Sequence, residues 1–266
     1  MFKFCSLFSG STGNSLLVET DNSKILVDAG ESAKKIVNAL SLVDVDISDI
    51  DAIIVTHEHS DHVKSLGTLS NKYNIPVYIT DVMLKSLDYL NNYVFLENEF
   101  DIGDMHIIAI KTSHDAPDSR GYIIISGDDS IVYITDTGYI NKKYFDILSN
   151  RNVYVMESNH DIEMLNNGSY PFNLRQRILS DKGHLSNYDS AKYLSSFIGN
   201  NTKCIILAHL SEDNNTEELA YNTLIERLND SDTHVDNIII AKQNKETELV
   251  KLWLRLFVLE KLKKNI

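Results

Sequence analysis

Cysteine, proline and positive charge are all scarce in this sequence of 266 residues. The two cysteines, Cys5 and Cys204, lie far apart without CxxC spacing, which argues against a disulfide framework or a thiolate metal site. Only three prolines are present, and no proline-rich or low-complexity linker divides the chain. Together with 43% hydrophobic residues, this predicts one compact domain.

Long apolar runs are also missing. No stretch reaches the roughly 20 residues that span a bilayer, and the first residues lack the basic and apolar regions of a secretion signal. We therefore expect a cytoplasmic protein without a membrane span. The net charge of −13 argues against a surface coated with cations for nucleic acid, although bound divalent ions and a local basic cluster can still attract phosphate.

One short stretch, residues 56–62 (THEHSDH), holds three histidines and two carboxylates. It follows the apolar residues 52–55, which predict a buried strand, so His57 and His59 would point the same way. On a helix, these histidines and Asp61 would scatter around more than half of the circumference. The spacing also differs from the H-E-x-x-H zinc motif. Imidazoles with a carboxylate are ligands that Zn²⁺ or Mn²⁺ prefers, so we interpret the stretch as most of a two-metal site.

Later apolar runs repeat this pattern, because each is followed by an acidic residue or a histidine. The runs and the residues that follow them are 131–135 with Asp136, 153–156 with Glu157, and 204–208 with His209. His114 lies where another predicted strand passes into a loop. In α/β proteins, binding sites assemble at the carboxyl ends of strands, so we expect these side chains to complete the metal site.

Several polar segments leave two interpretations open. Residues 9–14 (SGSTGN) form a turn that could cradle a phosphate or simply join two strands. Asp28, after another apolar run, would either support the site or form a turn. His184 precedes a helix that Ser186 would cap, a position where anions are favoured. The nearby cations, which either attract phosphate or form a solvated surface, are Arg175, Arg177 and Lys182.

The last residues, 250–266, are apolar on more than one face and lysine-rich at their end. This pattern predicts a helix packed on the rest of the domain, with a homodimer contact as the second interpretation. A helix lying on a membrane surface is less favoured. We place the end of the main domain at residue 252 and treat residues 253–266 as the helical tail.

Residues 57–62 (HEHSDH), followed in order by His114, Asp136 and His209, resemble the metallo-β-lactamase superfamily. The resemblance implies a single α/β domain, a four-layer αβ/βα sandwich with a dinuclear site along one edge of its sheets. Further segments resemble the WalJ/YycJ subgroup of that superfamily, whose members are exonuclease-like hydrolases of DNA. These segments are residues 9–14, 113–116, 135–138, 157–161 and 183–186.

The resemblance also implies a role for each candidate residue. One ion would be bound by His57, His59 and His114, and the other by Asp61, His62 and His209. Asp136 would bridge the two ions. His184, oriented by Glu157, would contact the phosphate or protonate the leaving group, while Asp61 would also orient the attacking hydroxide. The residues that we expect to bind substrate are Ser11, Asn14, Asn159, His160 and Arg175.

Such a site suits hydrolysis of a phosphodiester by a hydroxide shared between two divalent ions, Zn²⁺ or Mn²⁺, with iron also compatible. We therefore expect a 5′-to-3′ exonuclease that acts on DNA. The alternative within the same fold is a small-molecule hydrolase for a thioester, lactone or cyclic phosphodiester. The alternative outside enzymes is a metal-dependent sensor, which would not require His184.

Overall fold

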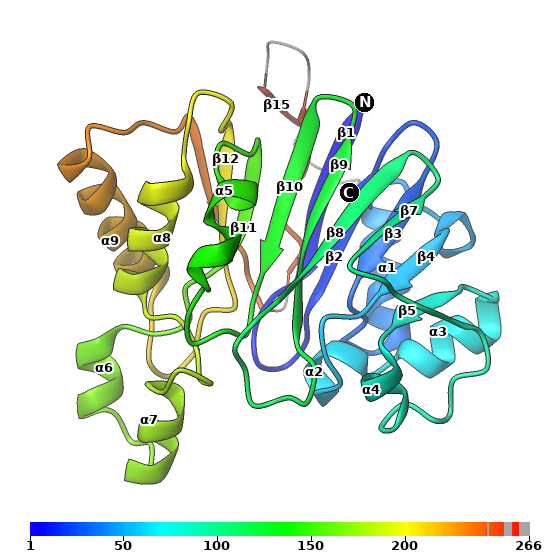
Figure 1. Cartoon of the computed structure of the whole chain (residues 1–266), viewed down its shortest axis with the longest axis horizontal. Coiled ribbons are helices and arrows are strands. Elements are labelled where there is room, and N and C mark those ends of the chain that lie inside the picture. Colours follow the sequence, from blue (N-terminus) through cyan, green and yellow to red (C-terminus); the bar gives the residue numbers. More distant parts are fainter. Residues whose placement is uncertain (244, 253–256, 261–266) are drawn as a thin grey trace, which may run out of the picture.

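The computed structural model describes residues 1–243, 245–252 and 257–260, the last four by their backbone. Within these residues the chain builds two mixed β-sheets that pack face to face (Figure 1). The first sheet has the strand order β15-β14-β1-β2-β3-β4-β5-β6, and the second has the order β13-β12-β11-β10-β9-β8-β7. The strands are β1 Phe2–Phe8, β2 Ser15–Glu19, β3 Lys24–Val27, β4 Ala52–Ile54, β5 Val77–Ile79, β6 Tyr93–Phe95, β7 Glu99–Ile102, β8 Met105–Lys111, β9 Arg120–Ser126, β10 Asp129–Ile134, β11 Val153–Glu157, β12 Cys204–Ala208, β13 Asn237–Ile240, β14 Leu249–Leu252 and β15 Phe257–Glu260.

Helices cover the outer face of each sheet, which gives four layers (Figure 1). α1 Ala33–Leu42 and α3 Leu66–Tyr73 pack on the first sheet, whereas α8 Asn187–Phe197 and α9 Glu217–Asp230 pack on the second. The shorter helices are α2 Ser60–Val63, α4 Asp81–Leu84, α5 Phe145–Leu148, α6 Ile162–Asn167 and α7 Phe172–Ile178, with 3₁₀ turns at Ile47–Asp49 and Lys142–Tyr144. The αβ/βα sandwich expected from the sequence is confirmed.

Side chains along each central strand alternate between two buried faces, and this produces three apolar cores. In β3, Ile25 and Val27 enter the core between the sheets, while Leu26 faces the core under α1 and α3. In β11, Val155 enters the core between the sheets, while Tyr154 faces the core under α8 and α9. Because successive side chains point to opposite faces and both faces are covered, these strands are continuous apolar runs in the sequence.

The parallel strands of both sheets end at one common edge of the sandwich. β3 to β6 run parallel in the first sheet, and β10 to β13 run parallel in the second. Their carboxyl ends meet at the edge that carries α2, at the bottom of Figure 1. The segments after β4, β10, β11 and β12 therefore lie together, as the apolar runs in the sequence predict.

The segments that follow β4 and β5 form short helices. Residues 63–73 form the end of α2 and all of α3, because the backbone N–H of Ser65 donates to the Ala29 carbonyl and interrupts the helical hydrogen bonds. In residues 82–90, the helix α4 ends at Leu84 and the rest of the segment forms turns. In the described part of the chain, no helix is long and apolar enough to cross a membrane.

The helix predicted for the C-terminal tail is wrong wherever the structure describes it. β14 pairs antiparallel with β1, and β15 pairs antiparallel with β14, so the first sheet continues past residue 252. The open edge of β1 has backbone groups that need partners, and an apolar segment beside it is stabilised as a strand. Residues 253–256 and 261–266, and with them most of the suggested dimer contact, lie outside the described residues.

Candidate metal centre

Residues 56–62 turn away from the end of β4 and lead into α2. β4 ends at Ile54 and runs into a turn, and His57 and His59 lie in that turn. The two imidazoles converge, with His57 Nε2 3.0 Å from His59 Nδ1. His59 is the N-cap residue of α2, and this one-turn helix carries Asp61 and His62. The turn followed by a helix therefore brings the histidines and Asp61 together.

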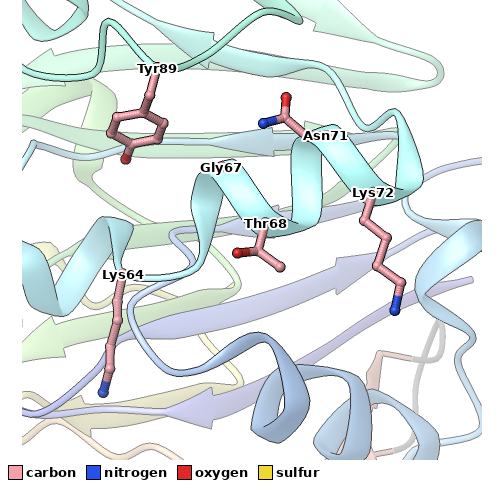
Figure 2. Close-up of a pocket in the computed structure, with 6 residues that line it drawn as sticks. All are labelled: Lys64, Gly67, Thr68, Asn71, Lys72 and Tyr89. Carbon is pink, nitrogen blue, oxygen red and sulfur yellow. The ribbon is translucent and has the colours of Figure 1, made fainter.

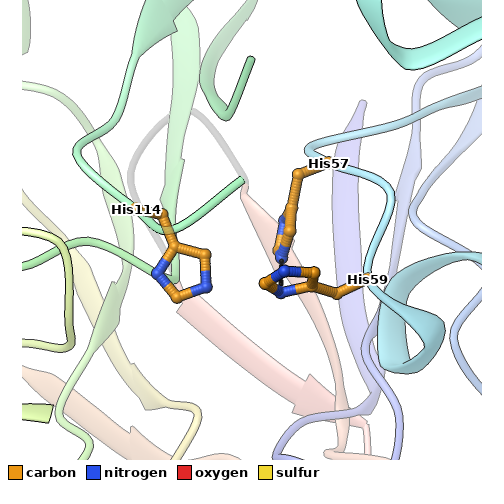
Figure 3. Close-up of side chains that lie close together, drawn as sticks. All are labelled: His57, His59 and His114. Carbon is orange, nitrogen blue, oxygen red and sulfur yellow. Dashed lines mark hydrogen bonds between the residues drawn. The ribbon is translucent and has the colours of Figure 1, made fainter. Parts of the chain in front are cut away.

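Four overlapping groups of side chains at this edge are close enough to hold an ion, and two of the three-residue groups share no member. In each group, one potential ligand atom per residue lies within 4.8 Å of the others. The first group is His57, His59 and His114, which approach one another from both sides of the edge (Figure 3). The second group is Asp61, His62 and His209. The structure thus brings together the same two sets of three residues that the sequence resemblance implies.

Asp136 lies between the two groups. It also forms a compact set with His57 and His62. Its Oδ2 lies 3.0 Å from Nε2 of His62, and its Oδ1 lies 3.6 Å from Nε2 of His114. This buried carboxylate follows the end of β10 and faces a histidine of each group, which is the placement that a bridging ligand requires.

Asp28, whose role the sequence leaves open, orients His62 from behind. Its Oδ2 lies 2.8 Å from Nδ1 of His62, and its carboxylate also accepts hydrogen bonds from the backbone and side chain of Thr56. Asp28 is fully buried. A carboxylate at Nδ1 keeps a proton on that nitrogen, so Nε2, which faces Asp136, is the nitrogen that would bind a metal.

Three residues at this edge adopt the left-handed backbone conformation that favours glycine. Asp28, Asp136 and His209, which follow β3, β10 and β12, have φ values of 65°, 55° and 56°. Non-glycine residues adopt this conformation at a cost of roughly 1–3 kcal/mol, and such residues concentrate at functional sites. Asp28 and Asp136 both contact His62, and such side-chain contacts hold the backbone in this conformation.

Glu157, the last residue of β11, links His184 to His209. Its Oε1 lies 2.7 Å from Nδ1 of His184 and 3.0 Å from Nδ1 of His209. Its Oε2 accepts hydrogen bonds from the backbone N–H groups of Thr137 and Leu185. Burial alone would raise the pKa of Glu157, but His184 and the hydrogen bonds outweigh it and lower the pKa to about 2. The charged carboxylate therefore fixes both imidazoles through Nδ1.

The charge balance of the centre fits bound cations. Burial alone would lower the pKa of His62, but Asp28 and Asp136 outweigh it and raise that pKa well above its usual value. Burial would also lower the pKa of His209, but Asp136 and Glu157 outweigh it and raise that pKa to about 9. Among the described residues, Nε2 of His209 has no hydrogen-bond partner. Buried carboxylates that attract positive charge, together with an unpartnered imidazole nitrogen, form a donor set that a divalent metal satisfies.

The predicted substrate-binding residues of the first turn differ in exposure. Ser11 lies on the exposed turn after β1. Asn14 is fully buried, with Nδ2 3.0 Å from Nε2 of His62 and within hydrogen-bonding distance of Asp61. Asn14 therefore braces α2 against the first turn, and a contact of either residue with substrate stays a prediction.

Asn159 and His160, which follow β11, are also buried. Nδ2 of Asn159 donates to the carbonyl of His209, so it supports the backbone of a candidate ligand. Neither ring nitrogen of His160 has a hydrogen-bond partner among the described residues, and burial lowers the pKa of its imidazole to about 4. Direct roles of these two residues in substrate binding stay predictions.

The two arginines of α7 have different partners. Arg175 donates to the carbonyl of Asn166 at the end of α6, so it joins the two helices. Arg177 forms an ion pair with Asp115, whose other carboxylate oxygen lies 3.2 Å from Nε2 of His114. The sequence reasoning assigns Asp115 no role of its own. Its position directly after His114 is the signal that could have drawn attention to it.

With the geometry established, comparison with known proteins identifies the family. The metallo-beta-lactamase superfamily matches residues 9–209 of the chain, the interval that holds every candidate metal ligand. The chain belongs to the metallo-β-lactamase superfamily. This fold implies divalent metal ions, in agreement with the His and Asp groups at the edge of the sheets.

Two relatives within the superfamily cover most of the chain. The chain is 41% identical to exodeoxyribonuclease WalJ of Streptococcus pneumoniae serotype 2 in an alignment of 244 positions that covers 88% of this chain and 91% of that protein. It is also 41% identical to exodeoxyribonuclease YycJ of Bacillus anthracis, over 82% of this chain and 85% of that protein. The subgroup resemblance inferred from short motifs is confirmed.

Solved structures of proteins with lower sequence identity share the fold. YhfI from Bacillus subtilis superposes with a TM-score of 0.71 at 18% identity, over 92% of this chain and 98% of that one. The short form of human tRNase Z superposes with a TM-score of 0.62 at 14% identity, also over 92% of this chain and 98% of that one. Both comparisons agree with the sandwich architecture.

A separate surface hollow of about 570 Å³ lies over α3 and the end of α2 (Figure 2). The ring of Tyr89 lies over one side of α3, while Lys64 and Lys72 extend from the other side. None of the candidate metal ligands lines this hollow. Its lining residues are Lys64, Gly67, Thr68, Asn71, Lys72 and Tyr89.

Gly30 allows the loop after β3 to pass directly against α2. A Cβ atom at this position would lie 1.6 Å from the carbonyl oxygen of Asp61 and 2.6 Å from the backbone nitrogen of Asn14. Because both neighbours are backbone atoms, Gly30→Ala must displace residues 56–62. We expect a loss of roughly 3 kcal/mol in the free energy of unfolding, together with a lower metal content.

Thermal unfolding and metal analysis of the purified variant check this prediction. Gly127→Ala is a suitable control, because Gly127 also has a positive φ but has nothing within 4 Å of the added carbon. It should lose about 1 kcal/mol and retain its metal content. A Gly30→Ala protein that binds metal as well as the control does would contradict the account of this contact.

Proposed function

We propose that this chain is a dinuclear metal-dependent phosphodiesterase that degrades DNA as a 5′-to-3′ exonuclease. The observation that carries the proposal is the pair of ligand groups on either side of Asp136, with His184 and Glu157 beside them. Two relatives that are 41% identical over most of the chain bear the name exodeoxyribonuclease, which supports DNA as the substrate. Direction of cleavage and the use of two ions, Zn²⁺ or Mn²⁺, are part of the proposal.

Six residues would hold the ions in two groups of three, with Asp136 between them. Two divalent ions, when bound, lower the pKa of water toward neutrality and neutralise the charge that develops on a phosphate oxygen. Asp28 fixes the ring of His62, and Glu157 fixes the ring of His209, so each presents Nε2 to the centre. The side chain of Asp61 is 21% exposed, and we assign it the orientation of the attacking water through a hydrogen bond.

His184 would donate the proton that the leaving alkoxide needs. Burial by itself would lower the pKa of His184, but Glu157 and Asp136 outweigh it and raise that pKa above its usual value. Because Glu157 contacts Nδ1, Nε2 is the nitrogen from which a protonated His184 would donate. An alkoxide is a poor leaving group, so this proton favours a phosphodiester over a thioester, whose thiolate leaves without being protonated.

A substrate panel tests the proposal. Metal-stripped protein is supplied with Mn²⁺ or Zn²⁺ and offered double-stranded DNA, single-stranded DNA, RNA, a lactone and a thioester in parallel. We expect metal-dependent release of nucleotides from DNA. Turnover of only the lactone or thioester would replace the nuclease with a small-molecule hydrolase, and metal binding without any turnover would favour a sensor.

The label position tests the direction of cleavage. On a DNA strand labelled at its 5′ end, a 5′-to-3′ exonuclease releases the label in the first product, as a mononucleotide or short oligonucleotide. On the same strand labelled at its 3′ end, the labelled product shortens gradually. The reverse pattern would overturn the proposed direction while leaving the metal-dependent hydrolysis intact.

A further inference from the structure

α6 and α7 project beyond the edge of the sheets next to the metal centre (Figure 1). The loop after α7 contacts the first ligand group, since the carbonyl of Gly183 lies 3.2 Å from Nδ1 of His114. Gly183 packs closely on α7 itself, because a Cβ there would lie 2.0 Å from the carbonyl oxygen of Ile178. The C-terminal turn of α7 is therefore fixed relative to the candidate ligands.

Arg177 extends from this turn to Asp115. The guanidinium forms an ion pair with Oδ2 of Asp115. Oδ1 of the same carboxylate lies 3.2 Å from Nε2 of His114 and 3.7 Å from Nε2 of His59. A single carboxylate group thus separates the guanidinium from two nitrogen atoms of the first ligand group.

The exposure of both partners leaves the ion pair open to exchange. The side chain of Arg177 is 54% exposed and that of Asp115 is 29% exposed. Exposed ion pairs contribute little free energy, so another anion held in place by the rest of the site can displace Asp115 from the guanidinium. A phosphodiester offers two non-bridging oxygen acceptors that share one negative charge, as a carboxylate does, and arginine binds such a pair through two parallel hydrogen bonds.

We propose that Arg177 binds the phosphate next to the scissile one in a DNA strand, and that Asp115 occupies the guanidinium until the substrate arrives. The inference rests on the proposed function, because it names how the same site recognises a chain of nucleotides. Arg177 is a substrate-binding residue in this scheme, and Asp115 is a competing anion. Because Arg177 binds a second phosphate, the enzyme would prefer a substrate that contains more than one phosphate.

Other cations near the centre fit this role less well. Arg175 is engaged with the Asn166 carbonyl, and its Nε is buried without a hydrogen-bond partner among the described residues. Lys64 and Lys72 line the hollow over α3, where none of the candidate ligands contributes to the lining. With a net charge of −13 on the chain, a local cation beside the ligands is what a polyanionic substrate requires.

The experiment compares single-stranded DNA of ten nucleotides with bis(p-nitrophenyl) phosphate, which has only one phosphate group. Arg177→Ala should raise KM for the DNA by about 10-fold or more, from the loss of charge-assisted hydrogen bonds. It should leave kcat/KM for bis(p-nitrophenyl) phosphate within about 2-fold. Arg177→Lys should recover part of the loss, because it restores the charge without the planar pair of donors.

Asp115→Asn gives a prediction of opposite sign. It removes the competing charge while keeping the shape of the side chain, so KM for the DNA should fall by about 2- to 5-fold. Metal content is measured for every variant, since Asp115 lies close to His114. When Asp115→Asn is combined with Arg177→Ala, it should not change KM for the DNA any further, because the lower KM that it causes depends on Arg177.

Direct binding provides a second readout. The dissociation constant for a phosphorothioate-linked decamer is measured by fluorescence anisotropy over a range of salt concentrations. Arg177→Ala should reduce the salt slope by about 0.7, the value for loss of one phosphate contact on a single strand. The matched control, Lys72→Ala in the hollow over α3, should change neither the affinity nor the slope.

Three results would overturn the inference. The first is an unchanged KM and affinity for DNA in Arg177→Ala, and the second is an equal loss on both substrates, which would mean that Arg177 only maintains the metal centre. The third is a loss with Lys72→Ala instead, which would place the strand over α3. If the unaltered protein hydrolyses bis(p-nitrophenyl) phosphate but not DNA, the proposed function fails, and that outcome is distinct from all three.

Discussion

Replacing His184 by alanine is expected to leave both metal sites loaded while lowering DNA turnover by about 10²–10⁴-fold, the usual contribution of a general acid. His184 contacts Glu157 and lies outside the two three-residue ligand groups, but it also forms a compact set with Asp136, Glu157 and His209. Without it, Glu157 still binds His209 and the backbone N–H groups of Thr137 and Leu185, so the second group keeps its support.

The measurement combines metal analysis with steady-state kinetics on labelled DNA. His106→Ala is a matched control, because His106 is 45% exposed on β8 and pairs with Asp101 at the sheet surface. The control should retain both metal and turnover. If His184→Ala loses metal in parallel with activity, then His184 is a structural part of the centre and not the proton donor.

After His184→Ala, the Asp136→Asn substitution should cause the largest loss of activity. Asparagine tolerates the left-handed backbone at this position, so the substitution changes the charge and leaves the backbone largely unaffected. Because Asp136 lies between the two ligand groups, we expect metal affinity to fall by at least about 100-fold and turnover to fall with it.

Metal titration of stripped protein, followed by calorimetry, measures this loss. Asp101→Asn is the control, since Asp101 is 71% exposed and lies away from both ligand groups on β7. Normal binding of two ions by Asp136→Asn would show that the bridging role is wrong. If the variant still binds one ion, the group that holds this ion depends less on the carboxylate of Asp136. That result is consistent with a bridging role.

The positions of the candidate site residues are predictable from the sequence because local patterns determine where they lie. Asp136, Glu157 and His209 each follow an apolar run, and a buried parallel strand must deliver the next polar residue to the carboxyl edge of its sheet. The structure places these three side chains at one edge with the turn after β4. The exact host of His57 and His59 is less predictable, because only the structure shows that β4 stops at Ile54.

The tail and the arginines show where sequence reasoning fails. An apolar segment such as 249–252 suits a helix or a strand, and its pairing with β1, at the other end of the chain, decides the outcome. The ion pair of Arg177 with Asp115 joins α7 to the loop after β8, so it depends on how the two segments pack. Spacing along the sequence contains no such information, and Arg175 is as good a candidate from the sequence as Arg177.

Activity as a function of added metal tests the central claim most directly. Stripped protein is titrated with Mn²⁺ while the degradation of end-labelled DNA is measured at each ratio of metal to chain. The account predicts no degradation without metal, and full activity only when about two ions are bound per chain. DNA degradation in the presence of excess chelator, or full activity with a single bound ion, would contradict a dinuclear metal-dependent exonuclease.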